Sequence, residues 1–70
     1  MTASWKIKAI LKKRHMTIAA LAEQVGMSRQ NLNNKLSRDN FSEKELAQLA
    51  EALGCTVEVV FTDLSDGEKL

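Results

Sequence analysis

The chain has 70 residues, of which 44% are hydrophobic and 27% are charged, and its formal net charge is +1. This size allows one small domain with a modest core, and no apolar run approaches the roughly 20 residues that span a membrane. The single cysteine, Cys55, excludes an internal disulfide and a cysteine-rich metal site. Lysines scattered through residues 1–15 do not fit a signal peptide, so we expect a cytoplasmic protein.

The charges are distributed unevenly along the chain. Residues 1–44 contain nine Lys or Arg against three Asp or Glu, whereas residues 45–70 contain one Lys against six Asp or Glu. A basic part joined to an acidic part indicates that one surface meets a polyanion and the other does not. The alternative is that these charges only solvate the outer faces of helices.

Apolar residues recur at helical spacing in four segments, residues 4–14, 18–25, 29–37 and 43–53. Each segment is therefore expected to form a helix that turns one apolar face to a shared core. The residues predicted for this core are Ile7, Ile10, Leu11, Ile18, Leu21, Ala22, Val25, Leu32, Leu36, Leu46, Leu49, Ala50 and Leu53.

Three of these helices share one type of start. Thr17, Ser28 and Ser42 each follow an apolar residue and precede a leucine at the spacing of a hydrophobic staple across an N-cap. Glu45 adds a capping box to Ser42, and loss of one such cap costs about 1 kcal/mol. Gly26 and Gly54 are placed to end the second and fourth helices.

The pattern changes after Gly54. Val57, Val59 and Phe61 alternate with other residues at strand spacing, and Asp66-Gly67 is a turn signal. We therefore expect residues 1–55 to form the helical part of the domain and residues 56–70 a C-terminal β-strand or hairpin. An isolated hairpin is marginally stable, so this ribbon must pack on the helices, pair with another chain, or both.

The second and third predicted helices are joined only by Gly26-Met27-Ser28, and Ala22 is small enough for them to approach closely. Such a connection is typical of a helix-turn-helix. The segment from residue 17 to 40 resembles the helix-turn-helix of the Cro and phage-repressor family. The residues that carry the resemblance are Thr17-Ile18, Leu21-Ala22-Glu23, Val25-Gly26-Met27-Ser28 and Leu32, followed by Phe41–Cys55, FSEKELAQLAEALGC.

This resemblance implies a mainly α, compact four-helix domain of the lambda-repressor type that binds double-stranded DNA. The chain departs from the family pattern at two places. Ile18 stands where the family often has a phosphate-contacting Gln, so that contact is not carried over. Lys35 and Leu36 stand where an aliphatic residue and a Glu are usual, and we expect Leu36 to supply the packing there.

The outer face of the third helix carries amide side chains. On a helical wheel Gln30 and Asn34 point away from the buried leucines, with Asn33 beside them. Gln and Asn can pair bidentately with the major-groove edge of adenine. The resemblance implies base contacts at Arg29, Gln30, Asn33 and Asn34, whereas Asn31 and Lys35 lie on the flank, near the backbone or solvent. The alternative is that these amides are ordinary surface residues.

Phosphate contacts are expected around this helix, because such contacts position a recognition helix. The helix N-termini at Thr17 and Ser28 present backbone N–H groups. Arg38, Asn40 and Lys44 surround the loop that follows. Lys12, Lys13 and Arg14 are weaker candidates, since basic residues at a helix end also complement the helix dipole. For any one of these residues, a purely solvated side chain remains the alternative.

No catalytic constellation is evident in the sequence. His15 and Cys55 are single residues without a third partner, so we expect no enzyme, no metal and no cofactor. His15 is expected in a loop, and Cys55 as a buried apolar residue. Trp5 falls opposite the apolar face of the first helix, where it either covers the ribbon or joins a subunit contact.

The sequence thus predicts a sequence-specific transcriptional regulator of prokaryotic or phage type, a Cro-like repressor. One recognition helix reads few base pairs, so a homodimer that reads half-sites about 34 Å apart is expected. Residues Val57–Thr62 are the candidate dimer contact. The alternative function is an antitoxin-like protein-interaction module, which holds another protein through its acidic C-terminal part.

Overall fold

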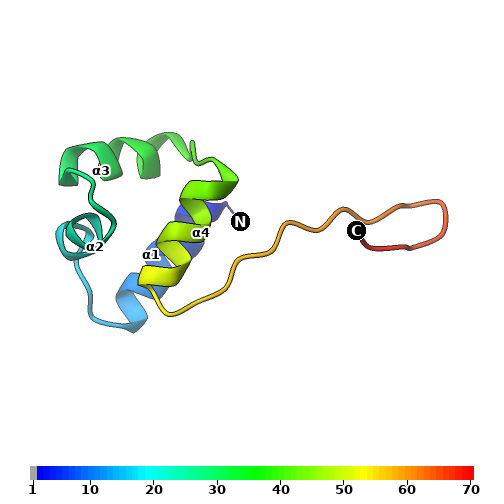
Figure 1. Cartoon of the computed structure of the whole chain (residues 1–70), viewed down its shortest axis with the longest axis horizontal. Coiled ribbons are helices and arrows are strands. Elements are labelled where there is room, and N and C mark those ends of the chain that lie inside the picture. Colours follow the sequence, from blue (N-terminus) through cyan, green and yellow to red (C-terminus); the bar gives the residue numbers. More distant parts are fainter. Residues whose placement is uncertain (1) are drawn as a thin grey trace.

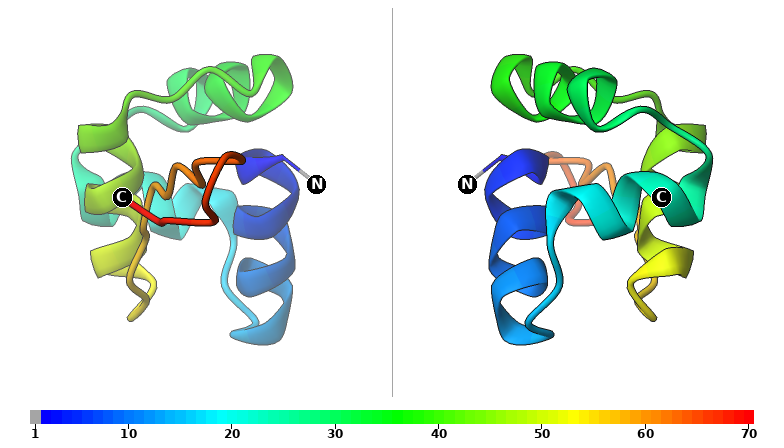
Figure 2. Two further views of the ribbon diagram at one scale, coloured as in Figure 1. Left: turned by 90° about the vertical axis from the view of Figure 1, so that its right-hand side faces the viewer. Right: turned by 90° about the vertical axis from the view of Figure 1, so that its left-hand side faces the viewer.

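The computed structural model describes residues 2–70. It contains four α-helices in chain order, α1 (Ala3–Lys13), α2 (Ile18–Val25), α3 (Arg29–Arg38) and α4 (Glu43–Ala52) (Figure 1). Their bounds agree with the sequence prediction to within one residue. α1 and α4 run in the same direction on opposite sides of the helical part, and α3 lies across one end of both (Figure 2). α2 packs against both α3 and α4.

The core draws on all four helices, and every one of its members was predicted. It consists of eight buried hydrophobic side chains, Ile7, Leu11, Leu21, Ala22, Leu32, Leu36, Leu49 and Leu53. The other five predicted residues, Ile10, Ile18, Val25, Leu46 and Ala50, are half-buried at its margin. Burial of each large aliphatic side chain contributes about 1.5–3 kcal/mol, which makes these leucines the main support of the helices.

The predicted helix starts are confirmed. The hydroxyls of Thr17 and Ser28 accept hydrogen bonds from backbone N–H groups three residues later, at 3.1 and 3.0 Å. Ser42 and Glu45 form the reciprocal capping box. Gly26 ends α2 with a φ of 74°, a left-handed conformation that permits the sharp turn into α3.

The predicted C-terminal strand is wrong for the chain as described. Within residues 2–70 the only β pairing is an isolated antiparallel bridge between Thr62 and Lys69. Phe61 and Leu70 exchange backbone hydrogen bonds of 3.0 and 2.8 Å beside it. A strand needs a partner, and residues 56–60 make no backbone hydrogen bond within the described part of the chain. The alternation of residues 57–61 therefore produces an extended segment without a sheet.

We call residues 55–70 the C-terminal arm. The arm leaves the end of α4 and projects away from the helices (Figure 1). The radius of gyration is accordingly 13.7 Å, compared with about 11 Å for a compact chain of this length. No helix among the described residues is long and apolar enough to cross a membrane.

Candidate nucleic-acid interface

The rotation of α3 about its axis determines which side chains it offers to a ligand. Leu32 is fully buried and Leu36 is 3% exposed, so both point into the core. Gln30 and Asn34 are exposed on the opposite side, and Asn33 is half-buried between the two faces. The wheel prediction for these residues is therefore confirmed, and the projecting arm does not cover the amide-bearing face (Figures 1 and 2).

A hollow of about 400 Å³ lies between the start of α2 and the first half of α3. Its lining brings together three of the predicted site residues, Thr17 at the N-cap of α2 and Arg29 and Asn33 from α3, with Ile18 and Ala19 completing it. The predicted base-contacting and phosphate-contacting positions thus adjoin each other on one side of the helix-turn-helix.

The start of α2 has free hydrogen-bond donors at this hollow. Thr17 caps the N–H of Ala20, and its carbonyl oxygen accepts from Leu21. The N–H groups of Ile18 and Ala19, by contrast, have no acceptor within residues 2–70. Neither α2 nor α3 has an acidic residue in its first turn, whereas α4 has Glu43 and Glu45 there. The positive ends of α2 and α3 are therefore free to attract an anion such as a phosphate.

The remaining predicted phosphate contacts follow the end of α3. Arg38 is the last residue of this helix, Asn40 lies in the connecting loop, and Lys44 is in the first turn of α4. All three side chains are exposed. They belong to the segment that joins α3 to α4, at the opposite end of α3 from the hollow at Thr17.

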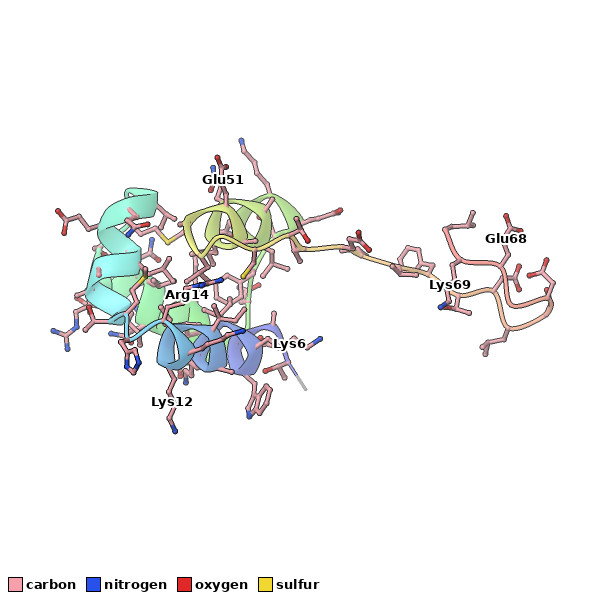
Figure 3. All side chains as sticks on the ribbon, turned by 90° about the horizontal axis from the view of Figure 1, so that it is seen from below. Lys6, Lys12, Arg14, Glu51, Glu68 and Lys69 are labelled. Carbon is pink, nitrogen blue, oxygen red and sulfur yellow. The ribbon has the colours of Figure 1, made fainter. Side chains whose placement is uncertain are left out.

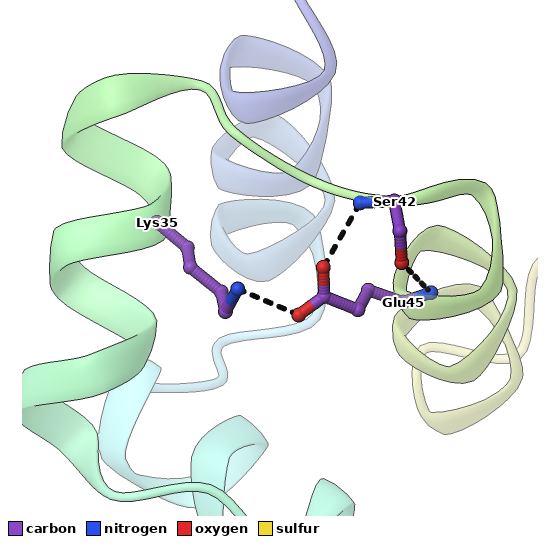
Figure 4. Close-up of polar contacts among 3 residues, drawn as sticks. All are labelled: Lys35, Ser42 and Glu45. Carbon is purple, nitrogen blue, oxygen red and sulfur yellow. Dashed lines mark hydrogen bonds and ion pairs between the residues drawn. The ribbon is translucent and has the colours of Figure 1, made fainter.

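Lys35 was expected near the DNA backbone or solvent, but the structure places it in an ion pair. Its Nζ lies 2.7 Å from Oε2 of Glu45, and both side chains are about three-quarters buried (Figure 4). The other carboxylate oxygen of Glu45 accepts the backbone N–H of Ser42 at 2.9 Å. The hydrogen bonds from Lys35 and Ser42 lower the pKa of Glu45 to about 2, and the one from Lys35 has the larger effect. This pair, ten residues apart, follows no local sequence pattern, and sequence reasoning missed it.

A second polar link joins the end of α3 to α1. Asp39 caps α3 in the left-handed region, at a φ of 51°. Its Oδ1 accepts the backbone N–H of Ser4 at 2.9 Å and the hydroxyl of Ser4 at 2.7 Å. Both hydrogen bonds lower the pKa of Asp39, and the one from the backbone N–H of Ser4 has the larger effect. Ser4 is a buried polar residue, 6% exposed, and this contact satisfies it. Sequence reasoning missed this link too, because 35 residues separate the partners.

Comparison with models of protein families matches residues 3–64 to the family described as winged helix-turn-helix DNA-binding. The chain belongs to this family. The match covers all four helices and part of the C-terminal arm. No curated protein and no solved structure matches the chain.

Membership in the winged helix-turn-helix family makes the chain a DNA-binding domain, with double-stranded DNA as its partner. Which residues of this domain contact the DNA stays a prediction. The narrower resemblance to Cro and the phage repressors stays a prediction.

Three other residues of this winged helix-turn-helix domain were singled out from the sequence. His15 lies in the loop after α1, as predicted, with a φ of 53°. Cys55 is half-buried rather than buried, because it begins the arm, and its Sγ lies 3.9 Å from Nη2 of Arg14. Trp5 is 56% exposed, so the arm of the same chain does not bury it.

Proposed function

We propose that this winged helix-turn-helix domain is a sequence-specific transcriptional regulator of prokaryotic or phage type, which acts in the cytoplasm by occupying its DNA site. The observation that supports this most strongly is the bare outer face of α3, where Gln30 and Asn34 are exposed opposite the buried Leu32 and Leu36. Asparagines are weak helix formers, yet three of them occur in this short helix. Their presence on this face is explained by base reading in the major groove.

In this proposal α3 enters the major groove with its N-terminal half. Gln30 and Asn34 pair with adenine edges, while Asn33 lies beside them at the hollow. Arg29, the first residue of α3, pairs with a guanine or an adjacent phosphate. A cation at this end of a helix is unfavourable for the helix dipole, which further supports a ligand-binding role for Arg29.

Phosphate contacts at both ends of α3 then hold the helix in register. The capped helix starts at Thr17 and Ser28 bind one part of the backbone through their N–H groups. Arg38, Asn40 and Lys44 bind another part beyond the end of α3. Contacts of this kind contribute affinity that decreases as the salt concentration rises, because each neutralised phosphate releases counterions.

One copy of α3 reads too few base pairs for a regulator, so the proposed active form is a homodimer on two half-sites about 34 Å apart. Its mechanism is repression by occupancy, which requires no catalytic residue, metal or cofactor.

The proposal is tested first by fluorescence anisotropy with a random-sequence DNA duplex at two salt concentrations. We expect binding at about 50 mM salt that weakens by at least roughly tenfold at about 200 mM, given several phosphate contacts. Selection of bound duplexes from a random pool then identifies the preferred site. Absence of any salt-sensitive binding, or selection that enriches no sequence, would contradict the proposal.

A protein-interaction module is the second candidate function. The exposed C-terminal arm, which carries four carboxylates, one lysine and several apolar side chains, favours it. An interaction module without DNA affinity would give no salt-sensitive anisotropy with DNA, and the same titration therefore separates it from a regulator.

A further inference from the structure

The C-terminal arm has one apolar face. Val57, Val59 and Phe61 alternate along the arm, so their side chains share one side of the extended backbone. Leu70 joins them, because residues that exchange both backbone hydrogen bonds lie directly opposite each other. The four side chains are 40, 53, 75 and 77% exposed in this order. An apolar row of this kind on a projecting segment marks a candidate interaction surface.

The arm also has one free backbone edge. Phe61 uses its N–H and C=O to pair with Leu70. Successive residues of an extended segment direct these groups to alternate edges, so those of Val60 and Thr62 point to the other side. Residues 56–60 make no backbone hydrogen bond within the part of the chain that the structure describes. The edge formed by Glu58, Val60 and Thr62 can therefore accept another strand.

We propose that a second copy of this chain covers the arm, by antiparallel pairing of residues 56–62 about a two-fold axis at Val59. The inference rests on the homodimer of the proposed function and specifies its contact. Pairing about Val59 uses all seven residues of the free segment. It places Val59 opposite the partner's Val59 and Val57 opposite the partner's Phe61, an aromatic and β-branched pair that stabilises sheets.

The neighbouring registers are less favourable. An axis at Glu58 would place two carboxylates directly opposite each other, which is destabilising. An axis at Val60 would place Val57 opposite the partner's Asp63 and so pair an apolar side chain with a charge. The composition of the arm therefore favours the axis at Val59.

A groove beside the arm fits this register. The groove has a volume of about 300 Å³ and lies between α1, α4 and the start of the arm. Its apolar lining includes Ile7, Ile10, Leu46, Leu49 and Leu53 from the helices and Val57 and Val59 from the arm. Since the partner's Phe61 lies opposite Val57, its ring is directed to this groove. Burial of one phenylalanine in each of two such grooves removes the most exposed aromatic side chain of both copies from water.

Charge complementarity supports the same register. The partner's Asp63 falls opposite Cys55, whose Sγ lies 3.9 Å from Nη2 of Arg14. The carboxylate of the partner's Asp63 is therefore brought near the guanidinium of Arg14. Arg14 is exposed and has no ion pair within residues 2–70 (Figure 3). The two acidic arm ends, at Asp66 and Glu68, lie far apart in an antiparallel pair, so their mutual repulsion is small.

The register is tested by cross-linking single-cysteine variants of the full chain, in which Cys55 is replaced by alanine. Val59→Cys places the two new thiols on the axis, where opposed Cα atoms are about 4.5 Å apart, within the range of a disulfide. Val60→Cys is the matched control, because Val60 is about as exposed as Val59. In the proposed register the Cα atoms of the two copies' residue 60 are about 8 Å apart, too far for a disulfide. Under mild oxidation we expect Val59→Cys to form covalent dimers at least tenfold faster. Equal rates would overturn the register.

The covering role of the partner is tested by sedimentation equilibrium. Phe61→Ser is expected to raise the dimer dissociation constant at least tenfold, whereas Leu64→Ser, which alters an even more exposed residue outside the paired segment, leaves it unchanged. Circular dichroism checks that both variants keep their helices. A monomer at all concentrations, or a dimer unaffected by Phe61→Ser, would overturn the inference.

The failure of this inference can be distinguished from failure of the proposed function. A monomer that still binds random duplex DNA in a salt-sensitive way would support the DNA-binding role and exclude the arm contact. A dimer with the predicted cross-link but without DNA binding would support the arm contact and exclude the regulatory role. Capture of a different protein by the arm in place of a second copy would overturn the inference and favour the interaction module.

Discussion

Nζ of Lys35 lies 2.7 Å from Oε2 of Glu45, and this ion pair ties α3, the proposed recognition helix, to the start of α4 (Figure 4). Glu45 also completes the capping box of α4, because its side chain accepts the backbone N–H of Ser42. Together with the link between Asp39 and Ser4, it holds the C-terminal half of α3 at two points. The orientation of the proposed reading face thus depends on polar contacts as well as on the buried leucines of α3.

The ion pair predicts an unusual effect of removing Glu45. Glu45→Gln retains a side-chain oxygen for the cap but releases the ammonium of Lys35 on α3, the helix proposed to bind DNA. We expect tighter nonspecific DNA binding, with a slope of log affinity against log salt that steepens by up to about 0.9. Anisotropy titrations in a salt series measure this slope.

Glu51→Gln is the control for that experiment. It removes the same charge from an exposed position of α4 and releases no lysine, since Glu51 has no ion pair within the described part of the chain. Its slope should equal that of the unaltered protein. If the two variants behaved alike, only net charge would matter and Lys35 would not face the DNA.

Stability is expected to decrease in acid. Hydrogen bonding to Lys35 and Ser42 lowers the pKa of Glu45 from 4.5 to about 2, and hydrogen bonding to Ser4 lowers that of Asp39 below 3.8. A carboxyl group whose pKa is lowered on folding stabilises the fold above its unfolded pKa. This contribution is lost as the pH falls through the folded pKa. The urea midpoint should therefore decrease as the pH falls from 4.5 to about 2, the unfolded and folded pKa values of Glu45.

The double variant Asp39→Asn, Glu45→Gln should lose most of this pH dependence, because neither replacement titrates. Asp63→Asn is the control. The pKa of Asp63 is also lowered, but by Ser65 within the same turn of the arm, remote from the helical core. An unchanged pH profile in the double variant would show that other groups control acid unfolding.

Two replacements of Ser28 separate its capping role from its proposed phosphate contact. Ser28→Ala removes the acceptor for the N–H of Asn31 and should lower the free energy of unfolding by about 1 kcal/mol. Ser28→Asp retains a cap and favours the helix dipole, so stability should be kept. Its negative charge repels a phosphate, and DNA binding should weaken in this variant. Thermal unfolding and anisotropy measure the two effects, and unweakened binding by Ser28→Asp would argue against the contact.

The amide face makes a prediction about specificity. The double variant Gln30→Ala, Asn34→Ala should lose preference for the selected site while retaining nonspecific binding, because its phosphate contacts remain. Each lost bidentate pair is worth about 1–3 kcal/mol of discrimination. Competition titrations with the selected duplex and a random duplex measure both properties.

A matched pair of amides serves as the control for this variant. Gln24→Ala, Gln48→Ala removes the same number of amides from exposed positions of α2 and α4 that lie together at a separate hollow, away from the outer face of α3. This control should alter neither specific nor nonspecific binding. A parallel loss of both kinds of binding in the variant of α3 would contradict base reading.

Local sequence patterns predicted most of the helical part. Three capping residues followed by leucines at fixed spacing located the starts of α2, α3 and α4, and the apolar periodicity identified all eight core residues. The exposed face of α3 followed from the same periodicity, since a residue opposite two buried leucines must face outward. The prediction of a C-terminal strand failed because strand alternation describes a segment suited to a sheet, and a sheet also requires a partner.

The sequence by itself thus determined the helices, their caps and the orientation of Gln30 and Asn34, because these depend on residues within a few positions of one another. Only the tertiary structure decided that Lys35 pairs with Glu45, that Asp39 binds Ser4, and that the arm leaves the helices with one edge unpaired. Each of these depends on how separate helices pack in space, and a side chain that meets a partner ten or thirty-five residues away leaves no periodic trace in the chain.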